Sequence, residues 1–468
     1  MYTYLHVRRR ITITKFTAIL AVSSLLLASS LLSYHQSIAA QPYVETVKYR
    51  NLVVDLGNGL KTNAQLTLPA VGKGPFPGVL LVPGSGPADM NYTLGVVNID
   101  NKTGSKIYPP TQFFQIAQYL SERGFVVIRY DKRGIGENGT SIDNNVWGNL
   151  TYNDLKHDAE AALGVLAHQP EVDAKRISII GHSEGGEIAT RIAINNPIAQ
   201  IKNIVLMAAR IQNAHDAMYY PLVGLPLEYA KQVLDKNHTE SITIEQAVKD
   251  PIYGRYIAFI LANNHNYSIT DSTNNNTTTL NTLNQLLGSS SNITDRQMVD
   301  AAGSINIDKE FKSMLERTFE SAFKASIGEI HFKCEPVEGP CPIYFNSLVS
   351  LEPTLSIIGN ISSSTGILML HGQNDSGSPV QQAFLLQQRL AELNHPDHAL
   401  ITYPTLGHNF YPSSLWGTTE AGPVPEYVLA DLYSWLETHS GFMSSYSGTR
   451  MANSSNSSTD VASFSSGK

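Results

Sequence analysis

The sequence predicts an α/β protein: a mostly parallel sheet with helices on both faces and a large, mainly helical lid insertion. Short, nearly continuous apolar runs recur along the chain, and amphipathic helical patterns lie between most of them. Strands of this kind are buried on both faces, which is typical of a parallel sheet covered by helices. The alternation fails once, at 211–360, where roughly 150 residues stand in place of a short connection, so this segment is predicted to be an insertion.

Residues 1–40 differ in kind from the rest of the chain. Four basic residues precede an apolar run at 16–32, and small residues follow at 37–40. This order predicts a secretory signal peptide, a mature chain that begins near Gln41, and a secreted or extracytoplasmic protein. The alternative is an uncleaved N-terminal anchor that tethers the protein to a membrane, because the apolar run reaches the lower limit for a span.

The charge of the chain excludes one class of partner. The formal net charge is −7, and loss of the four basic residues in 1–40 makes it −11. A mature chain this acidic offers no basic footprint for nucleic acid or for an anionic membrane surface, so the expected partner is a small molecule. Thirteen Asn-x-Ser/Thr sites agree with export and predict a glycoprotein, although a chain rich in Asn, Ser and Thr forms many by chance.

The mature chain is expected to open with a β-hairpin over 44–55 and 61–68, because Gly57-Asn58-Gly59 joins two β-rich runs. Six apolar runs after this hairpin are predicted strands: 79–82, 125–128, 177–180, 204–207, 367–370 and 399–403. A helix is expected over 111–123, and a capping box from Thr151 to Asp154 predicts the start of another.

The domain organisation follows from these patterns. Residues 41–210 and 361–440 are predicted to form the two parts of the core, and 441–468 a disordered Ser/Asn-rich tail. Within the lid insertion, 211–360, three helices and one polar mobile loop are expected; the helices are 221–233, 244–261 and 308–325, and the loop is 263–292.

Two cysteines, Cys334 and Cys341, bracket Glu-Pro-Val-Glu-Gly-Pro. In an exported protein they are expected to form a disulfide that closes a small loop, whereas two free thiols would fit a cytosolic protein better. Neither has the spacing of a zinc site or the partners of a catalytic thiol. No metal and no cofactor are predicted.

The predicted strand at 177–180 breaks directly into Gly181-His-Ser183-Glu-Gly185 and then into a helical pattern. This arrangement predicts a nucleophile elbow, in which the two glycines let strand and helix approach closely and the serine hydroxyl stands at the tip. The alternative is a Gly-rich turn with an exposed serine, so the interpretation depends on the residues that join it.

Three further loops follow predicted strands, where open α/β sheets bind ligands. In the first, 83–87, the N–H group of Ser85 is expected to bind an oxyanion together with the N–H group of Glu184. The other two contain Asp375 and His408. We expect Ser183 to be the nucleophile, His408 to take its proton and Asp375 to orient the imidazole. Singly, His408 could be a surface histidine and Asp375 a helix cap; together and in this order they predict a triad.

The motifs resemble those of a known family. They are Pro83-Gly-Ser-Gly-Pro-Ala-Asp89, Arg129-Tyr-Asp-Lys-Arg-Gly-Ile-Gly136, Ile180-Gly-His-Ser-Glu-Gly-Gly186, His371-Gly-Gln-Asn-Asp375 and Gly407-His408. They are similar to a branch of the α/β-hydrolase superfamily that contains serine carboxylesterases and is related to dienelactone hydrolases, serine aminopeptidases and acyl-CoA thioesterases. The resemblance covers about 45–210 and 361–440. It implies the α/β-hydrolase fold, the Ser183, Asp375, His408 triad and the oxyanion hole of Ser85 and Glu184.

A dinucleotide-binding loop is the alternative for Gly134-Ile-Gly136-Glu-Asn-Gly139, with Asp158 near the required distance. A helix must follow such a loop directly, but here a polar segment lies between the loop and the helix expected near Tyr152. Asp131 and Arg133 are instead expected to tie loops together beside the elbow.

The leading function is therefore a secreted serine hydrolase that cleaves a small acyl ester through an acyl-serine intermediate. Peptidase, aminopeptidase, thioesterase and acyltransferase activities stay open, because all pass through the same intermediate and a tetrahedral oxyanion. The rival class is a non-catalytic binding protein on a hydrolase scaffold.

Overall fold

The computed structural model describes residues 46–93, 98–99, 106–107, 111–196, 198–264, 304–328, 342–413, 420 and 423–441. The predicted signal peptide, both cysteines, nearly all of the loop 263–292 and the tail after residue 441 lie outside these ranges. All the described strands and helices belong to one compact unit. Within the described ranges, no helix is both long and apolar enough to cross a membrane.

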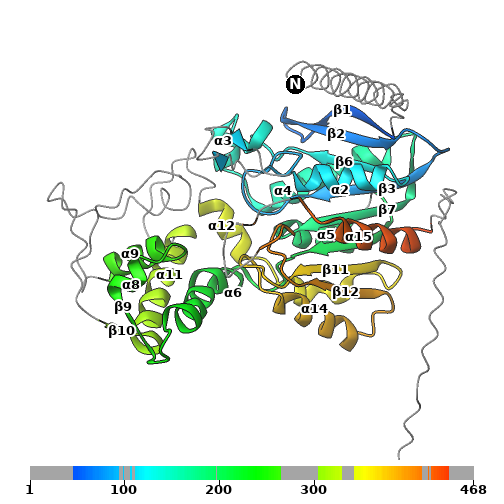
Figure 1. The fold of residues 1–468 in the computed structure, drawn as a ribbon. Coiled ribbons are helices and arrows are strands. Elements are labelled where there is room, and N and C mark those ends of the chain that lie inside the picture. Colours follow the sequence, from blue (N-terminus) through cyan, green and yellow to red (C-terminus); the bar gives the residue numbers. More distant parts are fainter. Residues whose placement is uncertain are drawn as a thin grey trace, which may run out of the picture. The chain divides into compact units, whose positions relative to one another are not determined.

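An eight-stranded sheet organises the chain, in the order β1-β2-β6-β3-β7-β8-β11-β12 (Figure 1). The strands are β1 Val47–Asp55, β2 Lys61–Pro69, β3 Phe76–Val82, β6 Val126–Tyr130, β7 Val172–His182, β8 Ile201–Met207, β11 Gly366–Gly372 and β12 His398–Tyr403. Strands β1 and β2 form the expected hairpin and β2 pairs antiparallel with β6, whereas all other neighbours are parallel. The predicted fold class is confirmed.

Helices cover this sheet. They are α2 Gln112–Ser121, α3 Asn144–Gly148, α4 Tyr152–Ala167, α5 Glu184–Ile194, α14 Gln381–Glu392 and α15 Glu426–His439, with a short 3₁₀ turn η1 at Glu137–Gly139 and a small ribbon of β4 Asn98–Ile99 and β5 Lys106–Ile107. The capping box is present: the Thr151 hydroxyl accepts from the Asp154 N–H, and the Asp154 carboxylate accepts from the Thr151 N–H. Helix α4 therefore begins where the sequence predicted.

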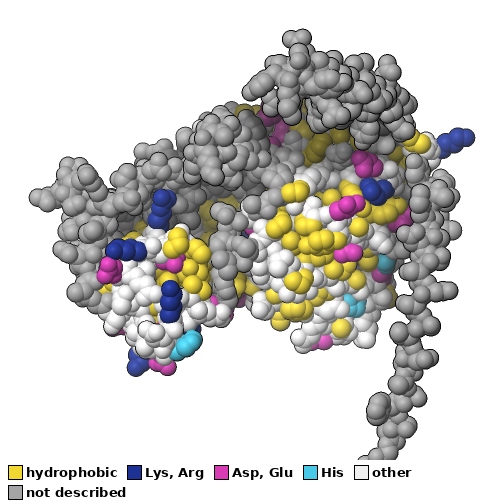
Figure 2. Space-filling view, in the orientation of Figure 1, with side chains coloured by type: hydrophobic (Ala, Val, Ile, Leu, Met, Phe, Trp, Pro, Cys, Tyr) yellow, Lys and Arg dark blue, Asp and Glu magenta, His cyan; other side chains and the backbone are white. Residues whose placement is uncertain are grey.

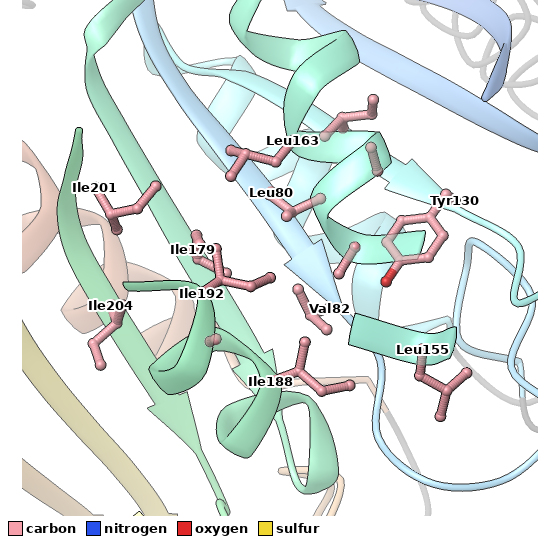
Figure 3. Close-up of a cluster of buried hydrophobic side chains, with 14 of the residues drawn as sticks. Leu80, Val82, Tyr130, Leu155, Leu163, Ile179, Ile188, Ile192, Ile201 and Ile204 are labelled. Carbon is pink, nitrogen blue, oxygen red and sulfur yellow. The ribbon is translucent and has the colours of Figure 1, made fainter. Parts of the chain in front are cut away.

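Apolar side chains fill both sides of the sheet. On one side Leu80, Ile179 and Ile204 pack with side chains from α4 and α5, among them Leu163 and Ile188 (Figure 3). On the other side, residues from the same strands pack with α2 and α15; they include Val79, Leu81, Ile180 and Leu370 from the sheet and Phe113, Ile116, Val428 and Leu432 from the helices. Because alternate residues of each strand are buried on opposite faces, the strand sequences are continuously apolar.

The insertion lies between β8 and β11. Its elements are α6 Ala214–Tyr219, η2 Tyr220–Gly224, α7 Leu225–Tyr229, η3 Ala230–Leu234, β9 Ser241–Thr243, α8 Ile244–Val248, α9 Gly254–Asn263, β10 Ser304–Asn306, η4 Ile307–Phe311, α11 Lys312–Ser326, α12 Pro342–Val349, α13 Thr354–Ile357 and η6 Ile358–Asn360. Turns η2, η3 and η4 are π-helical. The antiparallel pair β9 and β10 was not predicted.

The prediction of a single helix over 244–261 is wrong, because two helices occupy that range. Helix α8 ends at Val248 and α9 begins at Gly254. Asp250 accepts hydrogen bonds from the N–H groups of Ile252 and Tyr253, so it stabilises a turn at this point. Pro251 has no N–H group and disfavours helical geometry in the residue before it, which explains the break.

Most of the described part of the insertion packs on itself, around Phe311, Leu315 and Ile260. Helix α12 is different, because its Tyr344 and Leu348 belong to the apolar cluster of the core. The two ends of the insertion meet: the Leu355 N–H donates to the Ile211 carbonyl at 3.1 Å. On the face drawn in Figure 2, the coloured acidic and basic side chains of the described residues are scattered rather than gathered by sign.

Candidate active site

Ser183 stands at the turn between β7 and α5 in an unusual backbone conformation. Its φ is 53° and its ψ is −120°, although it is not a glycine. A Cβ atom on Gly181 would lie 2.1 Å from the Gly185 carbonyl oxygen, and a Cβ atom on Gly185 would lie 2.1 Å from the carbonyl oxygen of Val82. The predicted steric reason for both glycines is confirmed. Backbone strain of this kind persists where surrounding structure enforces it, commonly at functional sites.

Asp375 and His408 lie in the loops after β11 and β12, and they contact each other. The His408 Nδ1 atom is 2.9 Å from both carboxylate oxygens of Asp375. The Asp375 carboxylate also accepts from the N–H groups of Gly377 at 2.8 Å and Ser378 at 2.7 Å. Because this carboxylate is buried and multiply bonded, it holds the imidazole in one orientation and one tautomer.

The charges of this pair shift both pKa values. Burial alone would raise the pKa of Asp375. The effects of His408 and His371 are opposite and larger, so the pKa lies well below its ordinary value. Burial lowers the pKa of His408, whereas the Asp375 carboxylate raises it, and the net pKa is above the ordinary value. Asp375 is therefore ionised at neutral pH and can stabilise an imidazolium.

His408 also lies beside the elbow. Its ring centroid is 4.8 Å from that of His182, the residue before Ser183, and the His182 Nε2 atom is 2.8 Å from the His408 carbonyl oxygen. Within the described ranges, no hydrogen bond joins the Ser183 hydroxyl to the His408 imidazole. Catalytic hydrogen bonds are often long before substrate binds. The structure brings Asp375 and His408 into contact, and His408 contacts the residue that precedes Ser183.

The two N–H groups predicted to bind an oxyanion belong to segments that adjoin Ser183. Glu184 is the first residue of α5, where N–H groups have no partner inside the helix and the helix dipole favours negative charge. The loop of Ser85 packs on the nucleophile, because a Cβ atom on Gly84 would lie 2.8 Å from the Cβ atom of Ser183. Neither N–H donates to another residue in the described part of the chain.

His182 was not singled out from the sequence, although it adjoins Ser183. Burial is the main reason that the pKa of His182 is lowered to about 3, so its ring is neutral. Because a carbonyl oxygen only accepts, the His182 Nε2 atom donates to His408 and its Nδ1 atom accepts from the Tyr92 hydroxyl at 2.9 Å. The ring therefore links the elbow to the loop of His408.

Two other residues contact Asp375 and the backbone of His408. The His371 Nε2 atom lies 3.2 Å from the Asp375 carboxylate and 2.9 Å from the Ser378 carbonyl oxygen. The Glu420 carboxylate accepts from the N–H groups of His408 and Asn409. His371 could have been identified from the sequence, because it lies four residues before the predicted acid. No sequence pattern pointed to Glu420.

Asp131 ties two loops together as expected, whereas Arg133 pairs with helix α4 rather than with a loop. The Asp131 carboxylate accepts from the Met90 N–H at 2.7 Å, and Arg133 pairs with Asp154 and Asp158 of α4 at 2.6 Å each. The dinucleotide-binding alternative would need a free Asp158, but here its carboxylate is bound to Arg133. The helix that follows the glycines also begins only at Tyr152.

Comparisons with known proteins match part of this chain to a peptidase family and to an esterase. The model of a family described as serine aminopeptidase, S33, matches residues 111–297. Esterase EstD of Thermotoga maritima is 35% identical over 199 residues, which cover 41% of this chain and 42% of that protein. The chain thus spans less than half the length of this relative.

The family match and the relative are both hydrolases, as the motifs led us to expect. The resemblance predicted from the motifs is confirmed. Among solved structures similar to this chain, α/β hydrolase GrgF from Penicillium sp. sh18 shows 15% identity and a TM-score of 0.42, with 84% of this chain and 100% of that one covered. A thermophilic esterase from Thermogutta terrifontis shows 14% identity and a TM-score of 0.40, with 83% and 99% covered.

Proposed function

We propose that this α/β hydrolase is an exported serine hydrolase that cleaves carboxylic esters through an acyl-serine intermediate. One observation carries the proposal: Ser183 occupies a strained elbow beside His408, whose Nδ1 atom is bound by the buried Asp375 carboxylate at 2.9 Å. A serine hydroxyl is a weak nucleophile until a neighbouring base accepts its proton. This arrangement supplies such a base and fixes its tautomer.

In the proposed mechanism, the Ser183 oxygen attacks the ester carbonyl carbon while His408 takes the hydroxyl proton. The negative charge that forms on the carbonyl oxygen is bound by the N–H groups of Ser85 and Glu184. His408 then gives its proton to the leaving alkoxide, and the acyl group stays on Ser183. A water molecule repeats the sequence, releases the acid and restores the serine.

An ester substrate is favoured over a peptide with a free amino terminus. The relative with 35% identity is named an esterase, whereas the matching family model is described as an aminopeptidase. An aminopeptidase needs an anionic group for the substrate ammonium. The Asp375 and Glu420 carboxylates accept hydrogen bonds from backbone N–H groups. The Glu184 carboxylate is fully buried, accepts from the Tyr344 hydroxyl and lies 3.7 Å from the Lys132 ammonium. None of these three is free to bind an ammonium group.

A fluorophosphonate probe and a substrate panel test this proposal. The probe should label the wild type at Ser183 and should label the exposed-site control Ser363→Ala equally, but not Ser183→Ala. Acyl esters of increasing chain length, an aminopeptidase substrate and an acyl thioester, assayed side by side, identify the preferred class. Full esterase activity in purified Ser183→Ala would refute the assignment and favour the binding-protein alternative.

Export remains a proposal that rests on the leader and the cysteine pair, both outside the described residues. We expect a mature N-terminus near Gln41 and a disulfide between Cys334 and Cys341. Intact-mass analysis of natively secreted protein measures both. Retention of residues 1–40, or alkylation of two thiols without reductant, would contradict this part of the proposal.

The Asn-x-Ser site at Asn374 should stay unmodified even if other sites carry glycans. The Asn374 side-chain nitrogen donates to the Ser413 carbonyl at 2.9 Å, and the next residue is Asp375. A glycan attached to that nitrogen would compete with this packing. Glycopeptide mapping that finds Asn374 occupied in active protein would refute this claim or the choice of Asp375 as the acid.

A further inference from the structure

Three buried side chains meet behind the loop of Ser85. Lys132 follows β6, Glu184 begins α5, and Tyr344 comes from α12 of the insertion. The Lys132 Nζ atom donates to the Gly84 carbonyl at 2.5 Å and lies 3.7 Å from the Glu184 carboxylate. The Tyr344 hydroxyl donates to the other oxygen of that carboxylate. Neither Lys132 nor Tyr344 has a role in the proton transfers of the proposed reaction.

The contact of Lys132 controls one of the oxyanion donors. The Gly84 carbonyl and the Ser85 N–H belong to the same peptide unit, which is planar and trans, so they point in opposite directions. A hydrogen bond that fixes the carbonyl of Gly84 therefore fixes the direction of the Ser85 N–H. A cation on the carbonyl also polarises the peptide and strengthens its N–H as a donor.

The contact of Tyr344 acts on the other donor. Glu184 supplies the second N–H. One oxygen of its carboxylate accepts from the Tyr344 hydroxyl, and the other lies 3.7 Å from the Lys132 ammonium. Burial and the neighbouring carboxylate raise the pKa of Tyr344, so its hydroxyl keeps its proton and donates. The hydrogen bond from Tyr344 therefore restrains the first residue of α5, which carries this N–H.

The geometry favours this role over a simple ion pair. At 3.7 Å, the separation of Lys132 from Glu184 exceeds hydrogen-bonding distance, and the nearer carboxylate oxygen has no hydrogen-bond donor within the described part of the chain. The short contact of the ammonium is to the Gly84 carbonyl instead. A buried ion pair is in any case weak support for stability, because desolvation offsets the attraction.

We propose that Lys132 and Tyr344 are positioning residues of the oxyanion hole, and that the insertion sets the geometry of this hole through Tyr344. The proposal rests on the proposed esterase function. It assigns to the insertion a part in turnover that is separate from any contact with substrate.

Tyr344→Phe tests the role of the insertion, with Tyr152→Phe as matched control. Tyr152 is also a buried tyrosine, on α4, but its hydroxyl has no hydrogen-bond partner among the described residues. Because loss of a whole oxyanion donor costs about 10²–10³ in kcat, a misplaced donor should cost about tenfold to a hundredfold, with KM unchanged. The affinity for a boronic acid, which forms a tetrahedral adduct at Ser183, should fall by the same factor. The control should stay within about twofold in both measurements.

Lys132 needs a paired design, because Lys132→Met alone would leave a buried, unpaired carboxylate. The double variant Lys132→Met with Glu184→Gln removes the ammonium and the charge together and leaves both backbone N–H groups. We expect about a hundredfold loss in kcat and in boronic acid affinity, relative to Glu184→Gln alone. If this double variant fails to fold, Tyr344→Phe still decides the proposal.

The outcomes separate the two proposals. If wild-type esterase activity is lost in Ser183→Ala while Tyr344→Phe keeps wild-type kcat and boronic acid affinity, the positioning role is overturned and the proposed function stands. A fall in kcat without a matching fall in boronic acid affinity would also overturn the positioning role. A wild type that cleaves no ester would overturn both proposals.

Discussion

The sheet and the insertion place their residues at the site in different ways. Ser183, Asp375 and His408 follow three different strands, and hydrogen bonds of the parallel sheet and close backbone contacts at the glycines fix those strand ends. The insertion has a separate apolar cluster that includes Phe311. It reaches the site through α12, where Tyr344 contacts Glu184.

This difference separates two kinds of tolerance. A residue that follows a sheet strand can move only if the strand moves, so we expect changes there to abolish activity or folding. A residue that reaches the site through one side chain can be lost while the sheet stays intact. The insertion should therefore modulate the rate, whereas the sheet determines whether the reaction occurs.

The largest effect is expected from substitutions of the three residues that follow sheet strands. Ser183→Ala and His408→Ala should each lower kcat by about a millionfold, and Asp375→Ala by one or two decades less, because the three side chains act as a unit. A double variant should be little worse than Ser183→Ala. Steady-state kinetics on a preferred ester give these values, and additive losses would contradict a shared mechanism.

The next largest effect is expected from a substitution that destabilises the insertion. Phe311→Ala should cost about 4 kcal/mol in the stability of the insertion, because Phe311 is fully buried in its apolar cluster. Hydrogen exchange should show lost protection in α9 and α11 but retained protection in β3, β7 and β8. The control is Phe384→Ala, since Phe384 is half exposed on α14. Equal loss of protection in sheet and insertion would show that the two regions unfold as one.

A third change tests the close approach at the elbow. Gly185→Ala should lower the free energy of unfolding by about 3 kcal/mol, because the new Cβ atom would meet the Val82 carbonyl oxygen at 2.1 Å. Gly164→Ala is the matched control, because a Cβ atom there meets nothing within 4 Å and α4 continues through it. The control should stabilise the protein by about 0.5–1 kcal/mol. Denaturant unfolding measures both changes.

The smallest effect concerns pH. Neutral His408 is the base, so kcat/KM should fall as the pH drops through its pKa, which lies above the ordinary value of about 6.5. Burial opposes this shift, but the carboxylates of Asp375 and Glu420 outweigh it. Glu420→Gln should therefore move the midpoint of the pH profile to lower pH, while the exposed control Glu392→Gln should not. An unchanged midpoint in Glu420→Gln would exclude this electrostatic contribution.

The sequence predicted the sheet well because its strands are buried on both faces and are therefore continuously apolar. It predicted the elbow because close contact leaves only glycine at positions 181 and 185. The insertion was harder to predict. Its helices contain π-helical turns and a break at Pro251, and these depend on packing that periodicity does not encode.

The supporting residues of the site show the same limit. Lys132 lies between Asp131 and Arg133 in a motif that the sequence analysis identified. Its hydrogen-bond partner is the backbone carbonyl of Gly84, which no sequence pattern predicts. Tyr344 is separated from Glu184 by 160 positions in the chain. Such contacts follow from the tertiary fold, so the triad order could be predicted while the Tyr344 contact could not.

The hydrogen bond from Leu355 to Ile211 has a consequence for the length of the chain. Because the insertion leaves and rejoins the core at one point, the distance between its ends does not depend on how many residues lie between them. Added or deleted residues in the part that packs on itself therefore need not pull β8 away from β11, and the cost of closing a longer loop grows only slowly with its length. A foreign segment could therefore replace the part that packs on itself, provided that the graft keeps α12, whose Leu348 packs in the core and whose Tyr344 donates to Glu184.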